Sequence, residues 1–304
     1  MATKLEKKGI IVTNITQVDE QSRSQVADFL IEANVIDGLS LKEVRSTEVK
    51  AYLDNNDDIS FCIMWDKDYY LAKYIESKHI TVYNNAKCLK ICDDKALTYL
   101  ALLNHKIPTP KTFVFPQTYG DSILHYFDEV KDALNEIGYP LVIKERKGSF
   151  GEQVYLVNSE DELKQLLKSI GGKSLIAQEY ISYEKGVDYR VYVIKDEVVL
   201  AVKRTNKYDF RSNVNQGGTM QVIMPNEELQ KIALKATRAT GAIYAGVDIV
   251  KDSDDKYYVL EVNSNARTVN AQKVSEVNLP QKYLKAIYND NSLTRLSRSL
   301  KKKL

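Results

Sequence analysis

The sequence predicts a mixed α/β and α+β protein, in which a doubly wound parallel sheet is followed by two α+β units. Strands alternate with helices over roughly the first 90 residues, as in a parallel sheet with crossover helices. Further along the chain, two pairs of β-branched and aromatic runs are joined by polar turns, which indicates antiparallel hairpins. Between these regions, the prolines of residues 106–111 end a helix and mark a candidate domain boundary.

The N-terminal sheet is predicted from apolar strands and the helices between them. The helix after the first strand places Val26, Phe29 and Ala33 on one face, which is the period of an amphipathic helix. No Gly-x-Gly-x-x-Gly follows the first strand, so the fingerprint of a dinucleotide-binding Rossmann fold is absent. The predicted order is strand 9–14, helix 18–33, strand 59–65, helix 69–77 and strand 79–83.

Residues 65–68, with the sequence Trp-Asp-Lys-Asp, directly follow the second predicted strand. Open parallel sheets place their ligands beyond the carboxyl ends of the strands. We therefore expect either a substrate-binding loop or a plain turn at this position.

The middle of the chain alternates helices with strands and carries a glycine loop. Lys144 lies on the same strand face as Val142, so its side chain either extends to solvent or points into a site. Arg146 and Lys147 lead into Gly-Ser-Phe-Gly at 148–151, which lacks the Gly-Lys-Ser/Thr ending of a P-loop. The predicted elements are helix 96–105, strand 112–115, helix 121–138, strand 140–145, strand 153–157, helix 161–170 and strand 174–181.

The chain from residue 188 onward contains the two hairpins. In the first hairpin, Asp188, Arg190 and Tyr192 share one face, because strand side chains alternate. Residues 209–219 form a polar loop, and such loops on a rigid sheet concentrate ligand-binding groups. The basic tail at 291–304 is expected to be a frayed or amphipathic helix, or else a contact for an acidic partner. The predicted elements are strands 188–194 and 197–204, helix 226–241, and strands 246–250 and 257–263.

The second hairpin is expected to hold a metal ion. If Val250 pairs with Tyr257, then Asp248 faces Val259, and the acid and amide that follow lie on the same sheet face. Carboxylates inside an apolar strand are costly to desolvate unless a cation or a wet cleft accompanies them. Oxygen ligands suit a hard ion such as Mg²⁺ or Mn²⁺, whereas a slip of one residue would leave an accidental, solvated polar face. The side chains expected to converge are Asp248, Glu261 and Asn263.

Composition argues against several classes of function. With 43 Lys plus Arg and 41 Asp plus Glu, the net charge of +2 gives no global footprint for nucleic acid. Cys62, Cys88 and Cys92 include no Cys-x-x-Cys pair, which favours reduced thiols and a cytoplasmic location. No apolar run approaches the roughly 18 residues of a membrane span, and none near the start suits a signal peptide. The histidines lie far apart, so zinc chemistry and a His-based triad lack support.

A series of short motifs occurs in a fixed order between residues 140 and 263. They are Pro-Leu-Val-Ile-Lys at 140–144, the glycine loop at 148–151, Gln-Glu-Tyr-Ile at 178–181, Asp-Tyr-Arg at 188–190, Asp-Phe-Arg-Ser-Asn at 209–213, Gly-Val-Asp at 246–248 and Leu-Glu-Val-Asn at 260–263. In this order and spacing, they resemble the ATP-grasp superfamily and, within it, the RimK-like amino-acid ligases. The resemblance extends from about residue 59 to residue 263.

The resemblance implies a clamp for ATP and a ligase reaction. Such enzymes join a carboxylate to an amine through an acylphosphate and release ADP and phosphate. The expected substrates are an amino acid or other carboxylic acid and an amine acceptor, which is a small molecule, a peptide or a protein; a homo-oligomer is possible. The implied divisions are a pre-ATP-grasp domain at 1–92, a central subdomain with the glycine-loop lid at 93–181, a catalytic C-terminal subdomain at 182–290 and the basic tail.

The resemblance also implies roles for individual residues. Phosphoryl transfer depends mainly on cations placed around the γ-phosphate, and Arg190 and Arg211 are catalytic candidates for this. Arg267 is a candidate by its spacing instead, since it stands four residues beyond Asn263. It is either an anchor for the substrate carboxylate or a surface arginine. Lys95 is likewise either a phosphate contact or a surface charge. By position, the resemblance places ATP against Lys95, Lys144, Gly148, Ser149, Gly151, Glu179, Tyr180, Asp188, Arg211, Ser212 and Asn213. It places two ions of Mg²⁺ or Mn²⁺ against Asp248, Glu261 and Asn263.

The chain departs from the ribosomal-protein glutamate ligases directly after the metal strand. Those ligases carry a small turn with proline and glycine there, whereas this chain has Ser-Asn-Ala-Arg-Thr at 264–268. Glutamate as the donor and a ribosomal acceptor are therefore not implied. Two alternatives use the same residues: an ATP-binding regulatory module without ligase turnover, and an ATP-grasp kinase.

Overall fold

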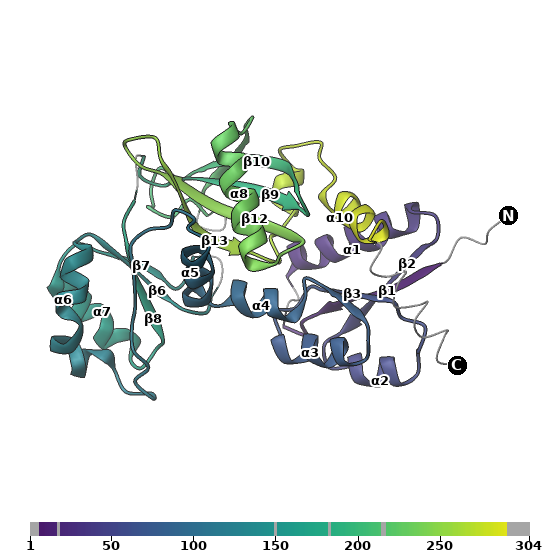
Figure 1. The fold of residues 1–304 in the computed structure, drawn as a ribbon, viewed down its shortest axis with the longest axis horizontal. Coiled ribbons are helices and arrows are strands. Elements are labelled where there is room, and N and C mark those ends of the chain that lie inside the picture. Colours follow the sequence, from purple (N-terminus) through teal and green to yellow (C-terminus); the bar gives the residue numbers. More distant parts are fainter. Residues whose placement is uncertain (1–5, 17–18, 149–150, 182–183, 214–216, 291–304) are drawn as a thin grey trace.

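The computed structural model describes residues 6–16, 19–148, 151–181, 184–213 and 217–290. Their strands form three sheets, which lie one after another along the long axis of the molecule (Figure 1). The strands of each sheet are consecutive in the chain and lie within residues 7–83, 112–179 and 187–263. The predicted combination of an α/β unit with α+β units is confirmed.

The N-terminal sheet is parallel throughout, in the order β2-β1-β3-β4. Ile11 and Ile63 face one core, whereas their neighbours Ile10 and Cys62 face another, so helices cover both faces of the sheet. β2 and α2 were not predicted. The elements are β1 (Lys7–Thr13), α1 (Glu20–Val35), β2 (Leu39–Arg45), α2 (Val49–Asp54), β3 (Phe61–Met64), α3 (Tyr69–Ser77), β4 (Thr81–Tyr83) and α4 (Ala86–Asp93).

The central sheet is antiparallel, in the order β5-β8-β6-β7, and has a hydrophobic core of its own. Leu141, Ile143 and Ala177 face helices α6 and α7 in that core. The alternate side chains, including Lys144 and Gln178, consequently lie on the opposite face of the sheet. The elements are β5 (Thr112–Val114), a 3-10 turn η1 (Ile123–Tyr126), α6 (Phe127–Ile137), β6 (Leu141–Glu145), β7 (Val154–Val157), α7 (Glu160–Ile170) and β8 (Leu175–Glu179).

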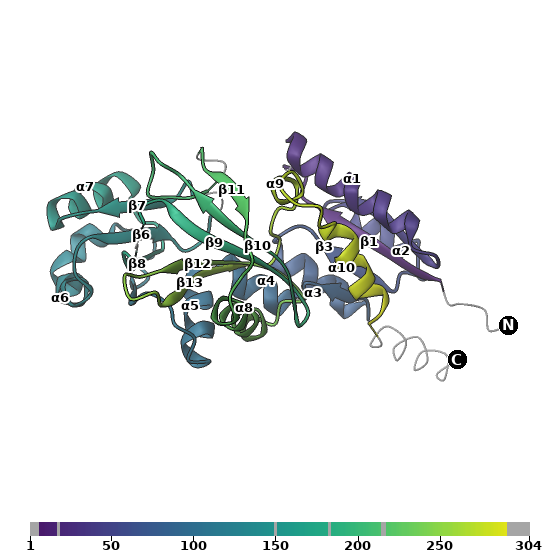
Figure 2. The same cartoon turned by 90° about the horizontal axis from the view of Figure 1, so that it is seen from above.

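The third sheet is antiparallel, in the order β11-β10-β9-β12-β13. One face packs on α8, and Tyr192 and Tyr244 on the other face share a core with Phe29 of α1 and Tyr283 of α10. α10 lies along α1 in both views (Figures 1 and 2). The elements are α5 (Lys95–Asn104), β9 (Val187–Ile194), β10 (Glu197–Thr205), β11 (Thr219–Val222), α8 (Glu227–Thr240), β12 (Tyr244–Lys251), β13 (Tyr257–Asn263), α9 (Val269–Gln272) and α10 (Leu279–Tyr288).

The expected domain boundaries at residues 92 and 181 stay a prediction. Two helices pack outside the unit to which these boundaries assign them. α5 contacts α8 and β13 of the third sheet, and α10 contacts α1 of the N-terminal unit. The N-terminal and third sheets thus share a core, whereas the central sheet keeps a separate one.

The expected register of the second hairpin is wrong. Val250 pairs with Tyr258 rather than with Tyr257, whose partner is Lys251. The reason is that β12 runs on through Lys251, which shortens the turn between the strands predicted at 246–250 and 257–263. The register of a hairpin follows from the length of its turn, so this one-residue difference changes the whole ladder.

A β-bulge at Leu260 then changes which side chains lie opposite one another. Ile249 pairs with Val259, Leu260 has no partner in the ladder, and Asp248 therefore pairs with Glu261 and not with Val259. Val259 turns into the core under α8, whereas Glu261 lies on the other face of the strand. The expected shared face of Val259 and Glu261 is therefore wrong, although the two acidic side chains do meet.

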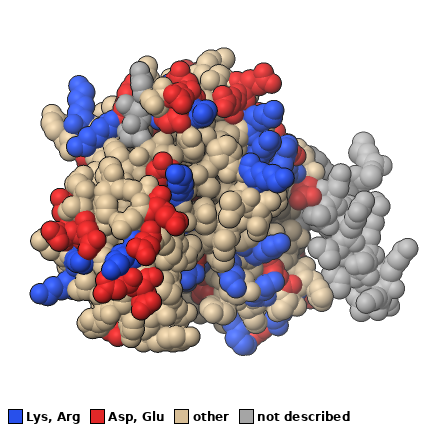
Figure 3. Space-filling model, turned by 60° about the vertical axis from the view of Figure 1, so that its left-hand side comes forward, with Lys and Arg blue, Asp and Glu red and all other residues tan. Residues whose placement is uncertain are grey.

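Charged side chains of both signs are interspersed on the face of the molecule drawn in Figure 3. This agrees with the near balance of 43 basic and 41 acidic residues in the sequence. Among the described residues, no helix has the length and apolar character needed to cross a membrane. The predicted basic tail at 291–304 lies outside the described residues.

Candidate active site

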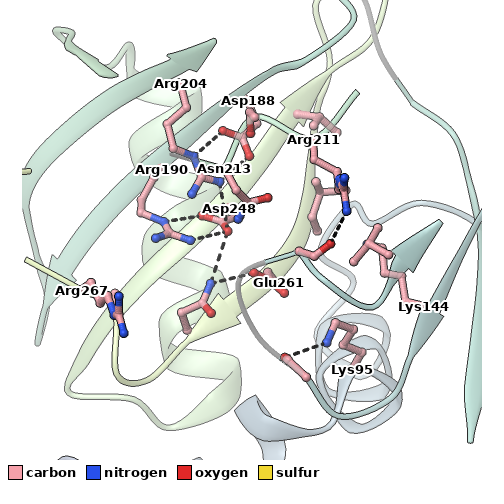
Figure 4. Close-up of a pocket in the computed structure, with 18 of the residues that line it drawn as sticks. Lys95, Lys144, Asp188, Arg190, Arg204, Arg211, Asn213, Asp248, Glu261 and Arg267 are labelled. Carbon is pink, nitrogen blue, oxygen red and sulfur yellow. Dashed lines mark hydrogen bonds and ion pairs between the residues drawn. The ribbon is translucent and has the colours of Figure 1, made fainter. Parts of the chain in front are cut away.

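A single cavity collects the predicted site residues at the place where the three units meet (Figure 4). Its walls come from the central sheet, the third sheet, the start of α5 and the loop after β3. Ser149 lies outside the described residues. The predicted residues that line the cavity are Lys95, Lys144, Gly148, Gly151, Glu179, Tyr180, Asp188, Arg190, Arg211, Ser212, Asn213, Asp248, Glu261, Asn263 and Arg267.

The three expected metal ligands converge on the β12-β13 hairpin. The Asn263 Nδ2 atom donates to Asp248 Oδ2 over 3.3 Å and to Glu261 Oε1 over 3.0 Å. Rotation of this amide would turn its Oδ1 atom toward the same point and give three oxygen donors, which suits Mg²⁺ or Mn²⁺. Within the described parts of the chain, no group of three His, Cys, Asp or Glu side chains forms a metal site, so the asparagine oxygen is needed to complete this set.

Asp248 belongs to a row of paired charges that crosses the third sheet. Arg190, directly opposite on β9, donates from Nε to Oδ1 over 2.7 Å and from Nη2 to Oδ2 over 2.6 Å. The Nη2 atom of Arg204 lies 3.1 Å from the same Oδ2. Burial opposes the ionisation of Asp248, but the two guanidinium groups outweigh it and hold the pKa of this carboxyl below its usual range. The carboxylate is therefore ionised at neutral pH.

Arg204 is a site residue that the sequence analysis missed. It is 2% exposed and pairs through two hydrogen bonds with Asp188, its cross-strand neighbour on β9. Since it also reaches Asp248, it links the acid expected near the nucleotide with the acid expected at the metal. The available signal was a basic residue inside the apolar strand 197–204, where a buried charge needs a partner.

Two neighbouring lysines line the cavity. Lys144, on the free face of β6, is 8% exposed. Burial lowers the pKa of its ammonium to about 8, even though Glu261 and Asp248 favour the charged form. Lys95 stands at the start of α5, and its Nζ atom donates to the carbonyl oxygen of Gly148 over 3.2 Å. Both cations are thus aimed at the space between the sheets (Figure 4).

Arg211 connects the glycine loop to the third sheet. Asp209 accepts two parallel bonds from its guanidinium, and the Nη1 atom donates to the carbonyl oxygen of Gly151 over 2.7 Å. Gly151 has φ +76, and a Cβ there would lie 3.0 Å from the Asn213 side chain. Only glycine meets both requirements without strain, so this position brings the loop close to residues 211–213.

An aromatic pair lines the cavity beyond Lys144. The rings of Tyr180 and Phe210 meet edge to face with centroids 6.2 Å apart. Gln178, which is 3% exposed, donates to the Thr112 hydroxyl over 2.9 Å, and its Oε1 atom has no partner among the described residues. An aromatic wall with a spare buried acceptor suits a heteroaromatic base that carries an amino group. Phe210 and Gln178 lie within quoted motifs, but neither was predicted as a site residue.

The other end of the cavity is built from the turn after β13 and the N-terminal unit. Arg267 donates to Gln21 over 3.0 Å and lies 3.2 Å from Asp19, at the start of α1. The Tyr192 hydroxyl donates to the carbonyl oxygen of Arg267 over 2.9 Å, which fixes the turn on the sheet. Arg267 therefore lines the cavity while part of its guanidinium is engaged by α1.

In the candidate substrate loop after β3, some side chains line the cavity and one is buried away from it. Trp65 and Lys67 line the cavity. Asp66 is buried, and both of its carboxylate oxygens accept from the Asn14 side chain. The carboxylate thus supports the loop, whereas its two neighbours face the cavity.

Comparison with known proteins agrees with this geometry. The model of the RimK-like ATP-grasp domain matches residues 92–287. A tetrahydromethanopterin:alpha-L-glutamate ligase of Methanocaldococcus jannaschii is 31% identical over 268 residues, which cover 84% of this chain and 87% of the relative. The alpha-aminoadipate--LysW ligase LysX of Saccharolobus solfataricus is 31% identical over 212 residues, which cover 67% of this chain and 73% of the relative.

A solved structure supports the same fold. The D-alanine--D-alanine ligase from Bacillus anthracis, complexed with ATP, superposes with a TM-score of 0.73 over 96% of this chain and 99% of its own. At 18% identity, this likeness shows the fold alone. The family model covers more than half of the chain, and the chain belongs to the RimK-like ATP-grasp domain family.

Proposed function

We propose that this protein is an ATP-dependent carboxylate-amine ligase that forms an amide bond through an acylphosphate and releases ADP and phosphate. One observation carries the proposal: a single cavity holds cations from two units opposite the oxygen-bearing hairpin of Asp248, Glu261 and Asn263. The relatives described above bear the names of ligases. The donor is an amino acid or another carboxylic acid, and the acceptor is an amine of a small molecule, a peptide or a protein.

ATP is proposed to lie between the central and third sheets. Lys95 and Lys144 would hold its phosphates, because both side chains line the cavity and carry positive charge. The aromatic pair of Tyr180 and Phe210 would contact the adenine, beside Glu179. The other proposed contacts are Gly148, Ser149 and Gly151 of the glycine loop and Asp188, Arg211, Ser212 and Asn213 of the third unit.

The hairpin is proposed to hold Mg²⁺ or Mn²⁺, with two ions when fully occupied. Asp248, Glu261 and Asn263 supply the oxygen donors that such ions prefer. When bound there, a divalent cation would neutralise charge on the β- and γ-phosphates. An ionised carboxylate offers about four lone-pair sites. Arg190 and Arg204 take three of those of Asp248, and rotation of the Asn263 amide would free the fourth for a cation.

The reaction divides into two steps with the protein supplying position and charge. A carboxylate oxygen of the donor attacks the γ-phosphorus, and the bond to the bridging oxygen of ADP breaks. The amine nitrogen then attacks the acyl carbon, phosphate leaves, and the nitrogen loses a proton. Arg190 and Arg211 present fixed positive charge on the cavity wall, which favours the negative charge that develops in both steps. Arg267 is proposed to hold the donor carboxylate.

The cellular compartment and the oligomeric state of the protein are also part of the proposal. Free Cys62, Cys88 and Cys92 suit a reducing cytoplasm. A homo-oligomer is a further prediction, which sedimentation of the purified protein at several concentrations would check.

Trapping with hydroxylamine tests the ligase proposal. The protein would be incubated with Mg²⁺, ATP and panels of amino acids, dipeptides and other acids, and both ADP and hydroxamate would be measured. ADP release with a hydroxamate shows that an acylphosphate was made. A stable phosphoester product would identify a kinase instead, and ATP binding without turnover of any acid would leave a regulatory module.

A further inference from the structure

Two cysteines touch each other beside the nucleotide end of the cavity. Cys88 and Cys92 lie one turn apart on α4, and their Sγ atoms are 3.8 Å apart. Cys88 is fully buried in the core under α8, whereas Cys92 is half-buried and lines the cavity. Cys62 belongs to a different core, on the outer face of the N-terminal sheet. The protein thus holds one thiol pair with a single thiol open to the cavity.

A bond between these sulfur atoms would not fit a regular helix. Side chains four residues apart on a helix have Cβ atoms about 5–6 Å apart. A disulfide needs Cβ atoms about 3.8 Å apart. The thiols are close enough to react, but bridging Cys88 and Cys92 must deform the last turn of α4.

That last turn is joined directly to the groups expected at the phosphates. Asp94 follows α4, caps α5 through Ala96 N over 2.9 Å, and accepts from Arg146 Nε over 3.1 Å. Lys95 donates from its backbone nitrogen to the carbonyl oxygen of Arg146 over 2.9 Å. Its ammonium reaches Gly148 of the glycine loop. A shift of residues 92–94 would therefore move Lys95 relative to the glycine loop.

We propose that Cys88 and Cys92 form a reversible thiol-disulfide site whose oxidation weakens nucleotide binding. The predicted change in nucleotide binding rests on the proposed ATP site, whereas the formation of the disulfide does not. Cys92 reacts first, because its side chain lines the cavity. Its thiolate attacks a small disulfide oxidant of the glutathione class and releases one thiolate. The Cys88 sulfur then attacks Cys92 in the mixed disulfide and expels the second thiol.

The balance of the reaction is two protein thiols plus one oxidant disulfide, giving one protein disulfide and two small thiols. The protein pair is oxidised and the oxidant is reduced, so no other reactant is needed. Strained disulfides are reduced readily, and the helix deformation makes this one labile. A reducing thiol should consequently restore the original state.

The first test measures the covalent change in the full chain. The protein would be treated with oxidised glutathione, and its thiols counted after denaturation. The count should fall from three to one, with a loss of about 2 Da in the intact mass. Cys62→Ala should still lose two thiols. Cys88→Ser should instead gain about 305 Da as a glutathione adduct on Cys92. Persistence of all three thiols, or a stable adduct on the unaltered chain, would overturn the proposal.

The second test measures the effect on nucleotide binding. Trp65 is the single tryptophan of the sequence and lines the cavity, so its fluorescence can report the binding of Mg·ADP. We expect the affinity for Mg·ADP to fall about tenfold on oxidation and to recover with dithiothreitol. By linkage, Mg·ADP should favour the dithiol by the same factor. A disulfide that leaves the affinity unchanged refutes the inference, whereas a reduced protein that binds no nucleotide refutes the proposed ATP site.

Discussion

ATP binding should weaken as the pH rises through the pKa of Lys144. This lysine is buried on the free face of β6, and burial lowers the pKa of its ammonium to about 8. Only the charged form attracts phosphate, so the free protein must be protonated at Lys144 before ATP binds tightly. A lysine of ordinary pKa would stay charged over this range and would give no such dependence.

The expected size follows from the charged fraction of the free protein. With a pKa of about 8, the apparent dissociation constant for ATP should rise about tenfold between about pH 7 and about pH 9. This dissociation constant would be measured by equilibrium titration without metal, with the fluorescence of Trp65 in the cavity wall as the signal. Lys144→Arg is the matched control, because a guanidinium stays charged throughout and the variant reports the pH effects of the nucleotide itself.

Two results would contradict this reasoning about Lys144. The first is the same pH slope in the unaltered protein and in Lys144→Arg, because the slope would then belong to another group. The second comes from Lys144→Met, which keeps the apolar stem and loses the charge. We expect weaker ATP binding with undiminished thermal stability of the free protein. A large loss of stability with unchanged ATP affinity would make Lys144 a structural residue.

The same pKa shift predicts how the stability of the fold depends on pH. In the folded protein the pKa of Lys144 is about 8, below the ordinary value of 10.5, so the unfolded chain binds this proton more tightly. The contribution of Lys144 to the free energy of unfolding should therefore rise with pH between these two values. Urea titrations of the unaltered protein and of Lys144→Met would isolate it, and an equal slope in both would contradict the assignment.

Three further predictions concern the carboxylates and arginines of the site. Asp248→Asn and Glu261→Gln should each lower metal-dependent turnover by about a hundredfold or more while circular dichroism is unchanged; near-normal turnover in both would show that the hairpin is not the metal site. Arg204→Met should lower the free energy of unfolding in urea by about 3–5 kcal/mol, because it leaves buried carboxylates without a partner. Lys203→Met removes only the surface pair with Glu184 and should cost much less; equal losses in the two variants would contradict the buried-pair assignment. Arg267→Lys should raise the KM of the acid with the KM of ATP unchanged, and unchanged kinetics for both would move the search for the anchor to the loop after β3.

Sequence patterns predicted the elements that carry strong periodicity. The helix expected at 69–77 has the bounds of α3, and the hairpin expected at 188–204 is β9 and β10. β2 was missed because it is an edge strand with the half-polar sequence Leu-Ser-Leu-Lys-Glu-Val-Arg, which shows little apolar alternation. The end of the chain before the tail was also left unassigned, although α10 buries Leu279, Tyr283 and Ile287 against the N-terminal unit.

Several residues that line the cavity were predictable because charged side chains within apolar strands are energetically costly. Asp248, Lys144 and Asp188 are charged side chains within apolar strands, and such residues need a cation, an anion or a cleft. The structure brings all three to one cavity. Their partners are a separate question, since strand alternation gives a face for each residue but does not give its neighbour across the ladder.

Two β-bulges decide those partners. Around the turn at Lys195-Asp196, a regular ladder would place Lys203 opposite Asp188, but the register shifts beyond Val198 and places Arg204 there instead. The second bulge likewise brings Glu261 opposite Asp248.

It matters physically that Arg204, and not Lys203, lies opposite Asp188. A lysine would offer Asp188 a single point charge, whereas the planar guanidinium of Arg204 holds Asp188 with two bonds and still reaches Asp248. A single inserted residue in each hairpin thus converts separate charged strands into one connected network. Because a bulge leaves no signal in the apolar alternation on either side of it, this network follows from the folded ladder rather than from local sequence.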